Sequence, residues 1–396
     1  MLPLFFLDVP ERPGYTIPDL FMEVFPMQPR LDSLASLPEL LSVFHIHTPL
    51  FVGRKREELL PLAALWPCFH GYHPNPDLSD CNAGMELFRA SGCDGIVAVG
   101  GGSCMDTAKA IKASLLSDAP DLLSRGILEP NPEQTIPLIA VPTTAGTGSE
   151  ATQTAVVYVN NRKVSLSHPL LRPDAVILDS QLLRDLPLLH KKCCALDALC
   201  QGIESYWSRS ATEESRRHAS IAILSVLEQF PAYLDGDKDA ARYMLRAAYE
   251  SGLAIQITRT TAAHAMSYIL TKTYDLPHGY ACAVTLPVLW DRLNQDPELS
   301  PVMQSLQALL GLRSLSDGPL LFRGLISWLS LPGLPVPDGN EIRKLVSEVN
   351  AERLGNHPQK LTESDLEQVY RKALMPMNVQ EQAEAISVWR DYAGLY

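Results

Sequence analysis

The sequence lacks the segments that would send the chain into or across a membrane. Residues 1–15, MLPLFFLDVPERPGY, have no basic residue ahead of the apolar run, and Asp8 and Pro10 cut that run short. We therefore expect no secretory signal peptide. The sequence has no run of about 18 or more apolar residues, which excludes a membrane-spanning helix. These absences predict a cytoplasmic protein that does not act at a membrane.

Paired cysteines and an excess of positive charge are also missing. The eight cysteines form no CxxC pair, and Cys193 and Cys194 are adjacent. This pattern is typical of reduced thiols in a cytoplasmic enzyme and not of a disulfide framework or a zinc knuckle. The formal net charge of -12 argues against nucleic acid or an anionic membrane as a general partner. A locally basic cleft could still bind a small anionic molecule.

Internal repeats and low-complexity tracts are absent, so we expect ordinary globular domains. A chain of 396 residues is too long for one small core, and two domains are the default expectation. Short apolar runs with the composition of buried strands occur at 48–53, 96–99, 136–141 and 175–178. They alternate with helical stretches such as 106–116, which predicts an open parallel sheet.

The second half of the chain has a different pattern. Long segments with helical periodicity dominate after residue 182, as at 213–234 and 239–257, and Thr362 is placed to cap a late helix. We predict a Rossmann-like α/β dinucleotide-binding domain over residues 1–182. An all-α domain that binds metal and substrate is predicted over residues 183–396.

A glycine turn stands between a predicted strand and a predicted helix. Gly100–Ser103 would let the backbone approach a phosphate, with the helix N-terminus offering free N–H groups. The turn is neither GxGxxG nor a Walker A loop, and a glycine-rich turn alone is often only a turn. A second turn, Pro142–Ser149, follows another predicted strand and is rich in hydroxyl groups. Two such turns in succession favour a dinucleotide.

Two histidines and a carboxylate make a candidate metal site. His264 lies among small and apolar residues, His278 follows fourteen residues later, and Asp197 lies in the helical segment ALDALCQGIESYW with Gln201 one turn on. One histidine in an apolar helix is usually a hydrogen-bonded core residue. Two of them with an aspartate on a third helix fit Fe²⁺ or Zn²⁺ better. Glu204, on the same helical stripe, stays unassigned, with an ordinary solvated face as the default interpretation.

Together these motifs resemble the iron-containing (group III) alcohol dehydrogenase family. The matching segments are Gly100–Ser103 with Asp106 and Lys109, 142–150, 197–199, His264 and 277–279. The resemblance implies the dehydroquinate synthase-like fold, with a Rossmann-like domain followed by an all-α domain. It also implies an oxidoreductase that uses a nicotinamide cofactor and a divalent metal. We expect the protein to act as a homodimer.

In that family one aspartate and three histidines hold the metal. Asp197, His264 and His278 match, but Gln201 stands where a histidine is expected, so metal could be bound less tightly, with water filling the gap, or not at all. Tyr268 stands where many members carry a further histidine that relays protons, and its ordinary pKa of roughly 10 makes it a poorer shuttle. The implied catalytic residues are His264, His278 and Tyr268.

The resemblance also implies a set of cofactor contacts. The pyrophosphate would lie on the glycine turn and the nicotinamide against the threonines of the second turn. These residues are Gly101, Gly102, Ser103, Asp106, Thr143, Thr144, Thr147 and Lys163. Many NAD-using relatives place an Asp where Gly53 stands here, and Arg54 and Lys55 follow it. Removing a carboxylate and adding cations favours a 2′-phosphate, so NADPH is preferred to NADH.

Within the family, the branch of phosphonoacetaldehyde reductases is most similar. The likeness lies in Asp-Ala-Leu-x-Gln over 197–201, in 258–268 and in 277–287. The implied reaction is reduction of phosphonoacetaldehyde to 2-hydroxyethylphosphonate. Arg259, five residues before His264 on the expected metal helix, would bind the anionic tail, unless it is an ordinary surface arginine. His168 with Ser167, and Lys272, are other candidates.

Other functions remain open at this point. Reduction of sulfoacetaldehyde to isethionate keeps the chemistry and changes the tail, and a simple alcohol or lactaldehyde oxidoreductase comes third. A cyclising lyase of the same fold would need several active-site lysines and arginines that we do not find. A metal-free binding protein is the remaining alternative, and Gln201 is its best argument.

Overall fold

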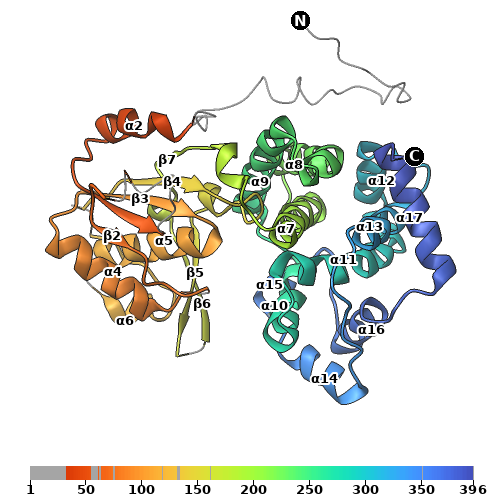
Figure 1. Ribbon diagram of the computed structural model, residues 1–396. Coiled ribbons are helices and arrows are strands. Elements are labelled where there is room, and N and C mark those ends of the chain that lie inside the picture. Colours follow the sequence, from red (N-terminus) through yellow and green to blue (C-terminus); the bar gives the residue numbers. More distant parts are fainter. Residues whose placement is uncertain are drawn as a thin grey trace, which may run out of the picture.

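The structure is a computed structural model, shown in Figure 1, and it describes residues 33–54, 61, 64–74, 76–117, 119–131, 134–160, 162–349 and 351–395. The N-terminal segment used for the signal-peptide prediction lies outside these residues, and so does Lys55. Among the described residues, no helix combines the length and the apolar character needed to cross a bilayer.

The first domain is built on a five-stranded parallel sheet, in the order β2-β1-β3-β4-β7. The strands are β1 (Pro49–Gly53), β2 (Cys68–Phe69), β3 (Gly95–Gly100), β4 (Leu138–Pro142) and β7 (Ala175–Val176). A parallel sheet covered on both faces needs short, continuously apolar strands, and the sequence shows such runs at four of these five positions. The predicted α/β fold with an open parallel sheet is confirmed.

Alternation along the strands sends side chains into two separate layers. Phe51, Val97 and Ile139 pack beneath α2 (Leu37–Val43), where Leu37 is fully buried. The intervening side chains pack in the larger core with α4 (Leu78–Ala90) and α5 (Gly102–Leu116). Successive side chains of a strand point to opposite faces, so each strand serves both layers.

An antiparallel hairpin extends from this domain and was not predicted. β5 (Thr154–Val159) pairs with β6 (Arg162–Ser167), and Figure 1 shows the pair below the sheet. Arg162 and Lys163 interrupt the apolar pattern of β6, which is why the strand is hard to detect in the sequence.

The second domain is helical, as predicted. Its helices are α7 (Leu188–Trp207), α8 (Glu213–Leu234), α9 (Lys238–Thr258), α10 (Ala262–Tyr274), α11 (His278–Asn294), α12 (Ser300–Leu309), α13 (Asp317–Trp328), α14 (Gly339–Ser347), α15 (Ala351–Leu354), α16 (Glu363–Ala373) and α17 (Val379–Ala393). Helices α8 and α9 match the predicted 213–234 and 239–257 closely. Thr362 caps α16 through a reciprocal capping box, which confirms that helix start.

The turn after β4 packs directly against the helical domain. Gly148 has φ 59°, and a Cβ added to it would lie 2.5 Å from the carbonyl oxygen of Ala248 on α9. Gly252, one turn further along α9, meets the carbonyl of Gly148 equally closely. Glycine at both positions therefore lets the β4 turn and α9 touch.

The last strand of the sheet ends at Val176 and α7 begins at Leu188. The domain boundary at residue 182 stays a prediction.

Candidate functional site

The glycine turn connects the end of β3 to the start of α5. Gly101 is the N-cap of α5, so no side chain occupies the first N–H groups of the helix. The amide of Thr143 donates to the carbonyl oxygen of Gly100 at 3.0 Å and joins this turn to the one after β4. The helix N-terminus and its glycines together make a cradle suited to a phosphate.

The threonine turn lies against the glycine turn. A Cβ added to Gly101 would be 3.1 Å from Cγ2 of Thr144, and one added to Gly102 would be 2.9 Å from Cγ2 of Thr147. The structure therefore brings together the glycines and threonines predicted to bind a dinucleotide.

Asp106 and Lys109 brace this region from behind. Oδ1 of Asp106 accepts a hydrogen bond from Ser149 at 3.0 Å. Lys109 is fully buried and donates to the carbonyl oxygens of Ser149 at 2.6 Å and Thr154 at 2.9 Å. Burial lowers the pKa of Lys109 to about 8. Lys109 thus ties α5 to the β4–β5 connection.

Gly53 ends β1 directly beside Val99, the strand neighbour that leads into the glycine turn. A Cβ at Gly53 would lie 2.5 Å from the carbonyl oxygen of Val99. The backbone at this position leaves no room for the carboxylate side chain expected in NAD-using relatives. Arg54 follows and is exposed.

Three predicted metal ligands meet in the helical domain. Asp197 comes from α7, His264 from α10 and His278 from the first position of α11. Oδ1 of Asp197 lies 3.2 Å from Nε2 of His264 and 3.8 Å from Nε2 of His278. The two imidazole rings meet edge to face, with centroids 5.4 Å apart. These are distances at which one ion could touch all three side chains.

Close packing of α11 against α7 makes this meeting possible. A Cβ added to Gly279 would lie 1.9 Å from the carbonyl oxygen of Cys193 and 2.9 Å from Cβ of Asp197. Only glycine lets the two backbones approach so closely. This contact brings the preceding residue, His278, beside Asp197.

Glu204, which the sequence left unassigned, is buried and does not lie on a solvated face. Its Oε1 accepts hydrogen bonds from the backbone amides of Thr261 at 3.1 Å and Ala263 at 2.9 Å, at the start of α10. Its Oε2 is hydrogen-bonded to Nδ1 of His264. Glu204 lies two helical turns after Asp197 on the same stripe, so the spacing was visible in the sequence.

Gln201 lies between the metal ligands and the threonine turn. Its Nε2 donates to Oδ1 of Asp197 at 3.3 Å and to the carbonyl oxygen of Thr147 at 3.2 Å. Its Oε1 accepts from the hydroxyl of Ser251 at 2.8 Å. In this arrangement the amide nitrogen faces Asp197, and the carbonyl oxygen, the atom that could bind a metal, faces α9.

Cys282 joins the cluster and was missed in the sequence. It lies one turn after His278 on α11, is fully buried, and its Sγ is 3.9 Å from Nε2 of His278. One donor atom from each of Asp197, His264, His278 and Cys282 lies within 4.8 Å of the others. The four-residue spacing from His278 was the available signal.

The charges in the cluster favour a cation at its centre. Burial opposes ionisation of Asp197, but His278 and the hydrogen bond from His264 hold the pKa of its carboxyl below the usual range. Burial also works against protonation of His278, but Cys282 and Asp197 raise its pKa to about 9. The thiol of Cys282 has a pKa lowered to about 7, because the two histidines outweigh burial.

Tyr268 is half-buried and lies one turn after His264 on α10. Its ring stacks on that of His278, with centroids 5.8 Å apart and planes 9° from parallel. Nζ of Lys163, on the β6 hairpin strand, lies 3.1 Å from the Tyr268 ring centroid, and Cζ of Arg353 lies 5.9 Å away. Burial raises the pKa of Tyr268, but Arg353 and Lys163 outweigh it and bring the pKa to about 8.

Comparison with known proteins places the chain in a family. The family described as "Iron-containing alcohol dehydrogenase" matches residues 32–180, and "Fe-containing alcohol dehydrogenase family, C-terminal" matches residues 193–318. The chain belongs to the iron-containing alcohol dehydrogenases. The resemblance predicted from the motifs is therefore confirmed, together with the fold.

Two curated relatives and one solved structure are similar to this chain. A phosphonoacetaldehyde reductase of Streptomyces viridochromogenes is 39% identical over 225 residues, 54% of this chain and 57% of the relative. A lactaldehyde reductase of Escherichia coli is 32% identical over 60% of this chain and 63% of the relative. The chain thus spans about three-fifths of the length of the curated relatives it matches. A sulfoacetaldehyde reductase of Bifidobacterium kashiwanohense, solved in complex with NAD+, is 26% identical with a TM-score of 0.80, over 89% of this chain and 98% of the other.

Arg259 does not lie on the helix that carries His264, and that part of the prediction was wrong. Helix α9 ends at Thr258 and α10 begins at Ala262, so the exposed Arg259 occupies a break with φ 59°. The apolar and small residues on both sides of the break gave a continuous helical pattern. Lys272, another candidate for the anionic tail, is exposed and paired with Glu348 at 3.0 Å.

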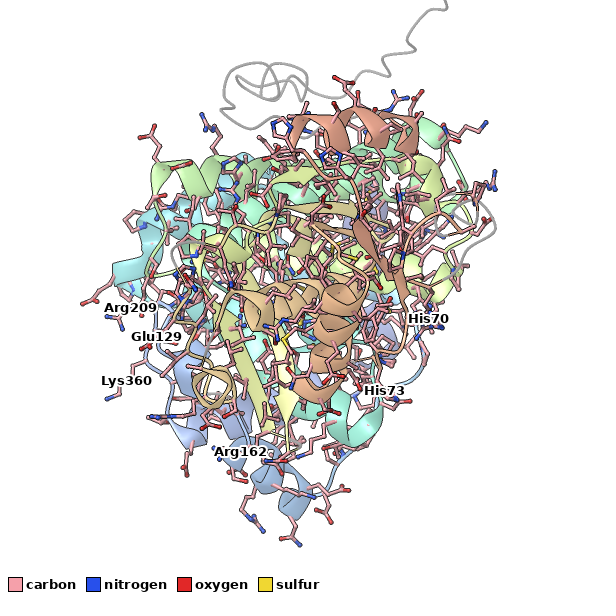
Figure 2. All side chains as sticks on the ribbon, turned by 90° about the vertical axis from the view of Figure 1, so that its left-hand side faces the viewer. His70, His73, Glu129, Arg162, Arg209 and Lys360 are labelled. Atoms are coloured by element: carbon pink, nitrogen blue, oxygen red, sulfur yellow. The ribbon has the colours of Figure 1, made fainter. Side chains whose placement is uncertain are left out.

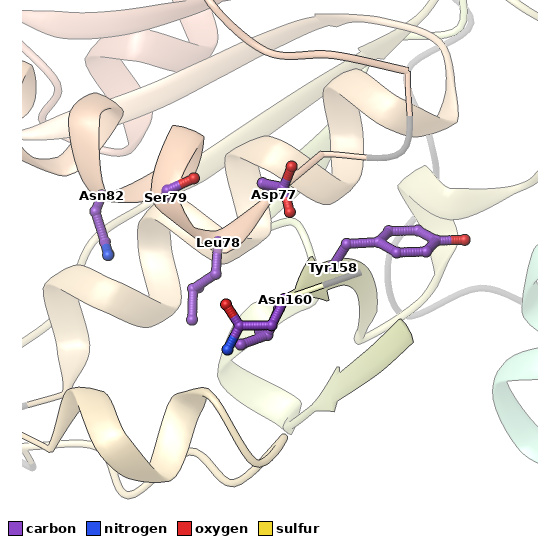
Figure 3. A pocket seen from close by; sticks show the side chains of 7 residues that line it. Asp77, Leu78, Ser79, Asn82, Tyr158 and Asn160 are labelled. Atoms are coloured by element: carbon purple, nitrogen blue, oxygen red, sulfur yellow. The ribbon is translucent and has the colours of Figure 1, made fainter. Parts of the chain in front are cut away.

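Other features of this iron-containing alcohol dehydrogenase lie away from the cluster. Figure 2 shows His70 and His73 at an outer edge of the molecule, where His73 pairs with Asp80 at 3.0 Å. A cavity of about 360 Å³ lies between the start of α4 and the β5–β6 hairpin (Figure 3). Its lining residues are Asp77, Leu78, Ser79, Asn82, Tyr158, Val159 and Asn160. None of the predicted site residues lines this cavity.

Proposed function

We propose that the protein is an NAD(P)H-dependent, metal-assisted reductase of a short anionic aldehyde. The observation that carries the proposal is the position of Gln201, which hydrogen-bonds both Thr147 of the dinucleotide turn and Asp197 of the metal cluster. One side chain thus separates the predicted nicotinamide contact from the predicted metal ligands. Hydride transfer to a polarised carbonyl needs these two groups side by side.

The chemistry of the cluster fits a divalent metal. When Nδ1 of His264 donates to Glu204, its Nε2 is an acceptor, and it faces the acceptor Oδ1 of Asp197 at 3.2 Å. With His264 neutral, these two facing acceptors in a buried site favour a cation between them. Imidazole and carboxylate ligands suit Fe²⁺ or Zn²⁺, which would supply Lewis acidity to the aldehyde oxygen. Asp197, His264 and His278 would hold the ion.

The remaining residues have distinct roles in this proposal. The start of α5, with Gly101, Gly102 and Ser103, would bind the pyrophosphate of the cofactor. Thr143, Thr144 and Thr147 would hold the nicotinamide, the source of the hydride.

Tyr268 would hold at Oη the proton that the product alcohol gains. The nearby cations lower its pKa to about 8, so this phenol is a better proton donor near neutral pH than its ordinary pKa implies.

Two cations beside Tyr268 support an anionic substrate. Lys163 and Arg353 approach the same ring from the β6 hairpin strand and from α15. An aldehyde held near His278 would place a charged tail within reach of both. We therefore prefer these two residues to the exposed Arg259 as binders of the tail, although Lys163 was predicted among the cofactor contacts.

Phosphonoacetaldehyde is the preferred substrate, giving 2-hydroxyethylphosphonate. The 39% identity to the phosphonoacetaldehyde reductase supports it. Sulfoacetaldehyde is the second candidate, supported by the solved sulfoacetaldehyde reductase of the same fold. Lactaldehyde, which lacks the anionic tail, comes third.

NADPH is the preferred cofactor. The packing of Gly53 against Val99 supports this, because it excludes a carboxylate that would hydrogen-bond the ribose of NADH. A cytoplasmic location and a homodimer stay predictions.

The test is a substrate panel. The purified protein, supplied with Zn²⁺ or Fe²⁺, is mixed with NADPH or NADH and with phosphonoacetaldehyde, sulfoacetaldehyde or glycolaldehyde. We expect cofactor oxidation that is fastest with phosphonoacetaldehyde and NADPH. Oxidation fastest with sulfoacetaldehyde would change the substrate only, whereas no oxidation with any aldehyde would overturn the proposal.

A further inference from the structure

The position where the family supplies a third histidine holds Gln201, whose amide nitrogen faces Asp197. The opposite amide orientation would bring Oε1 against two other acceptors, Oδ1 of Asp197 and the carbonyl oxygen of Thr147. The observed orientation instead satisfies both of them and accepts from Ser251. Gln201 is thus fully used as a hydrogen-bonding residue, and the metal cluster lacks a ligand from α7 at this position.

We propose that Cys282 supplies the fourth protein ligand, as a thiolate, and that Gln201 only positions Asp197. The inference rests on the metal in the proposed function but not on the identity of the aldehyde. The predicted ligand set Asp197, Gln201, His264 and His278 becomes Asp197, His264, His278 and Cys282.

The geometry around Cys282 supports ligation. In a tetrahedral zinc site with metal–ligand distances of about 2.0–2.3 Å, ligand atoms lie about 3.3–3.8 Å apart. Here Nε2 of His278 is 3.8 Å from Oδ1 of Asp197 and 3.9 Å from Sγ of Cys282, and all four donors lie within 4.8 Å. Small side-chain movements would complete the shell without moving a helix.

The histidines already present the required nitrogens. Nδ1 of His264 is occupied by Glu204, and Nδ1 of His278 lies 3.5 Å from the hydroxyl of Ser267. Their Nε2 atoms are left to face Asp197. Hydrogen bonds on the second ring nitrogen are what usually orient a metal-binding histidine.

The alternative is that Cys282 is an inert buried thiol, as most buried cysteines are. Cys200, a buried cysteine on α7, is such a case, because it lies outside the four-donor cluster. A thiolate among the ligands favours zinc or iron over ions that prefer oxygen, such as Mg²⁺. Binding M²⁺ would release the thiol proton to solvent.

Spectroscopy of the cobalt-loaded protein tests the proposal without any turnover. The full chain is freed of metal, loaded with Co²⁺ and examined for the near-ultraviolet sulfur-to-cobalt charge-transfer absorption. We expect this band in wild type, in Cys200→Ser and in Gln201→Ala, and its loss in Cys282→Ser. We also expect Cys282→Ser to weaken zinc binding at least about tenfold, and Gln201→Ala to weaken it less. A wild-type spectrum without the band, or a band that survives in Cys282→Ser, would overturn the proposal.

A second measurement covers the case in which Cys282→Ser does not fold. X-ray absorption at the zinc edge of the wild-type protein should show one sulfur at about 2.3 Å beside nitrogen and oxygen at about 2.0–2.1 Å. A shell of nitrogen and oxygen alone would contradict the inference. Because neither experiment uses an aldehyde, a thiolate ligand found in a protein that reduces none of them would sink the proposed function and leave this inference standing.

Discussion

Glu204 and His264 are hydrogen-bonded to each other inside the helical domain. Glu204 lies near the end of α7, and His264 lies in the first turn of α10. The same carboxylate accepts backbone N–H groups at the start of α10. One side chain therefore caps the helix and fixes which nitrogen of His264 faces Asp197. This contact makes the metal site dependent on a residue that would not touch the metal.

Glu204→Gln tests that dependence. Removing the charge weakens the hydrogen bond that orients His264, so we expect the zinc affinity to fall about 10- to 100-fold. Competition titration against a chromophoric chelator measures it. The exposed Glu213→Gln makes the same charge change on α8 and should leave the affinity unchanged. An affinity in Glu204→Gln equal to wild type would remove Glu204 from this role.

Tyr268→Phe tests the proton donor. Phenylalanine keeps the ring that stacks on His278 and removes only the hydroxyl. We expect kcat for aldehyde reduction to fall on the order of 100-fold, with KM little changed. Tyr274→Phe, at the other end of α10, is the control and should behave as wild type. If kcat of Tyr268→Phe stays within about twofold of wild type, water delivers the proton instead.

Lys163→Ala and Arg353→Ala test the anion site. Each should reduce kcat/KM for phosphonoacetaldehyde relative to glycolaldehyde by about 10- to 100-fold. This is the loss expected when one charge-assisted hydrogen bond to the substrate is removed. The ratio of kcat/KM for the two aldehydes cancels any effect of the cations on Tyr268, because the reduction of both aldehydes depends on Tyr268. Arg259→Ala is measured in parallel. A loss of discrimination in Arg259→Ala alone would return the anionic tail to that residue.

Because His357 is buried, we expect the free energy of unfolding to fall in acid. This histidine is 1% exposed, neither ring nitrogen has a hydrogen-bond partner among the described residues, and burial lowers its pKa to about 4 although Glu204 opposes the shift. The unfolded chain, with a histidine pKa of about 6.5, binds this proton first as the pH falls. Stability is therefore full above about pH 6.5 and declines between pH 6.5 and 4, by about 1.4 kcal/mol at pH 5.5.

Urea unfolding at pH 7.5 and 5.5 measures this effect. His357→Leu should lose about 1.4 kcal/mol less than wild type between the two pH values. His73→Leu, which replaces an exposed histidine, should follow wild type. Identical pH dependence in His357→Leu and wild type would mean that His357 accepts its proton in the folded state.

The parts of the fold that sequence patterns predicted are those with strong local signals. Apolar runs followed by glycine-containing turns located β3 and β4, and the capping box at Thr362 located α16. Hairpin strand β6 was missed because Arg162 and Lys163 break its apolar pattern. Helix α10 was extended back to Arg259 because a single residue with positive φ leaves no mark on hydrophobic periodicity.

In the site, the predicted histidines and Asp197 come together, whereas their partners depend on packing between helices. Glu204 stayed unassigned, because sequence spacing does not tell which face of α7 meets α10. Cys282 was counted only among the reduced thiols, and its place beside His278 follows from the close contact of Gly279 with α7. Residues whose role depends on a tertiary contact are the ones that local patterns miss.

The central claim, metal-assisted reduction of an anionic aldehyde, is tested most directly by removing and restoring the metal. NADPH oxidation with phosphonoacetaldehyde is followed in the purified protein, then after chelation, then after stoichiometric Zn²⁺ or Fe²⁺ is returned. We predict turnover that stops on chelation and recovers with one metal ion per chain. Turnover that continues unchanged in protein shown to be metal-free would contradict the account.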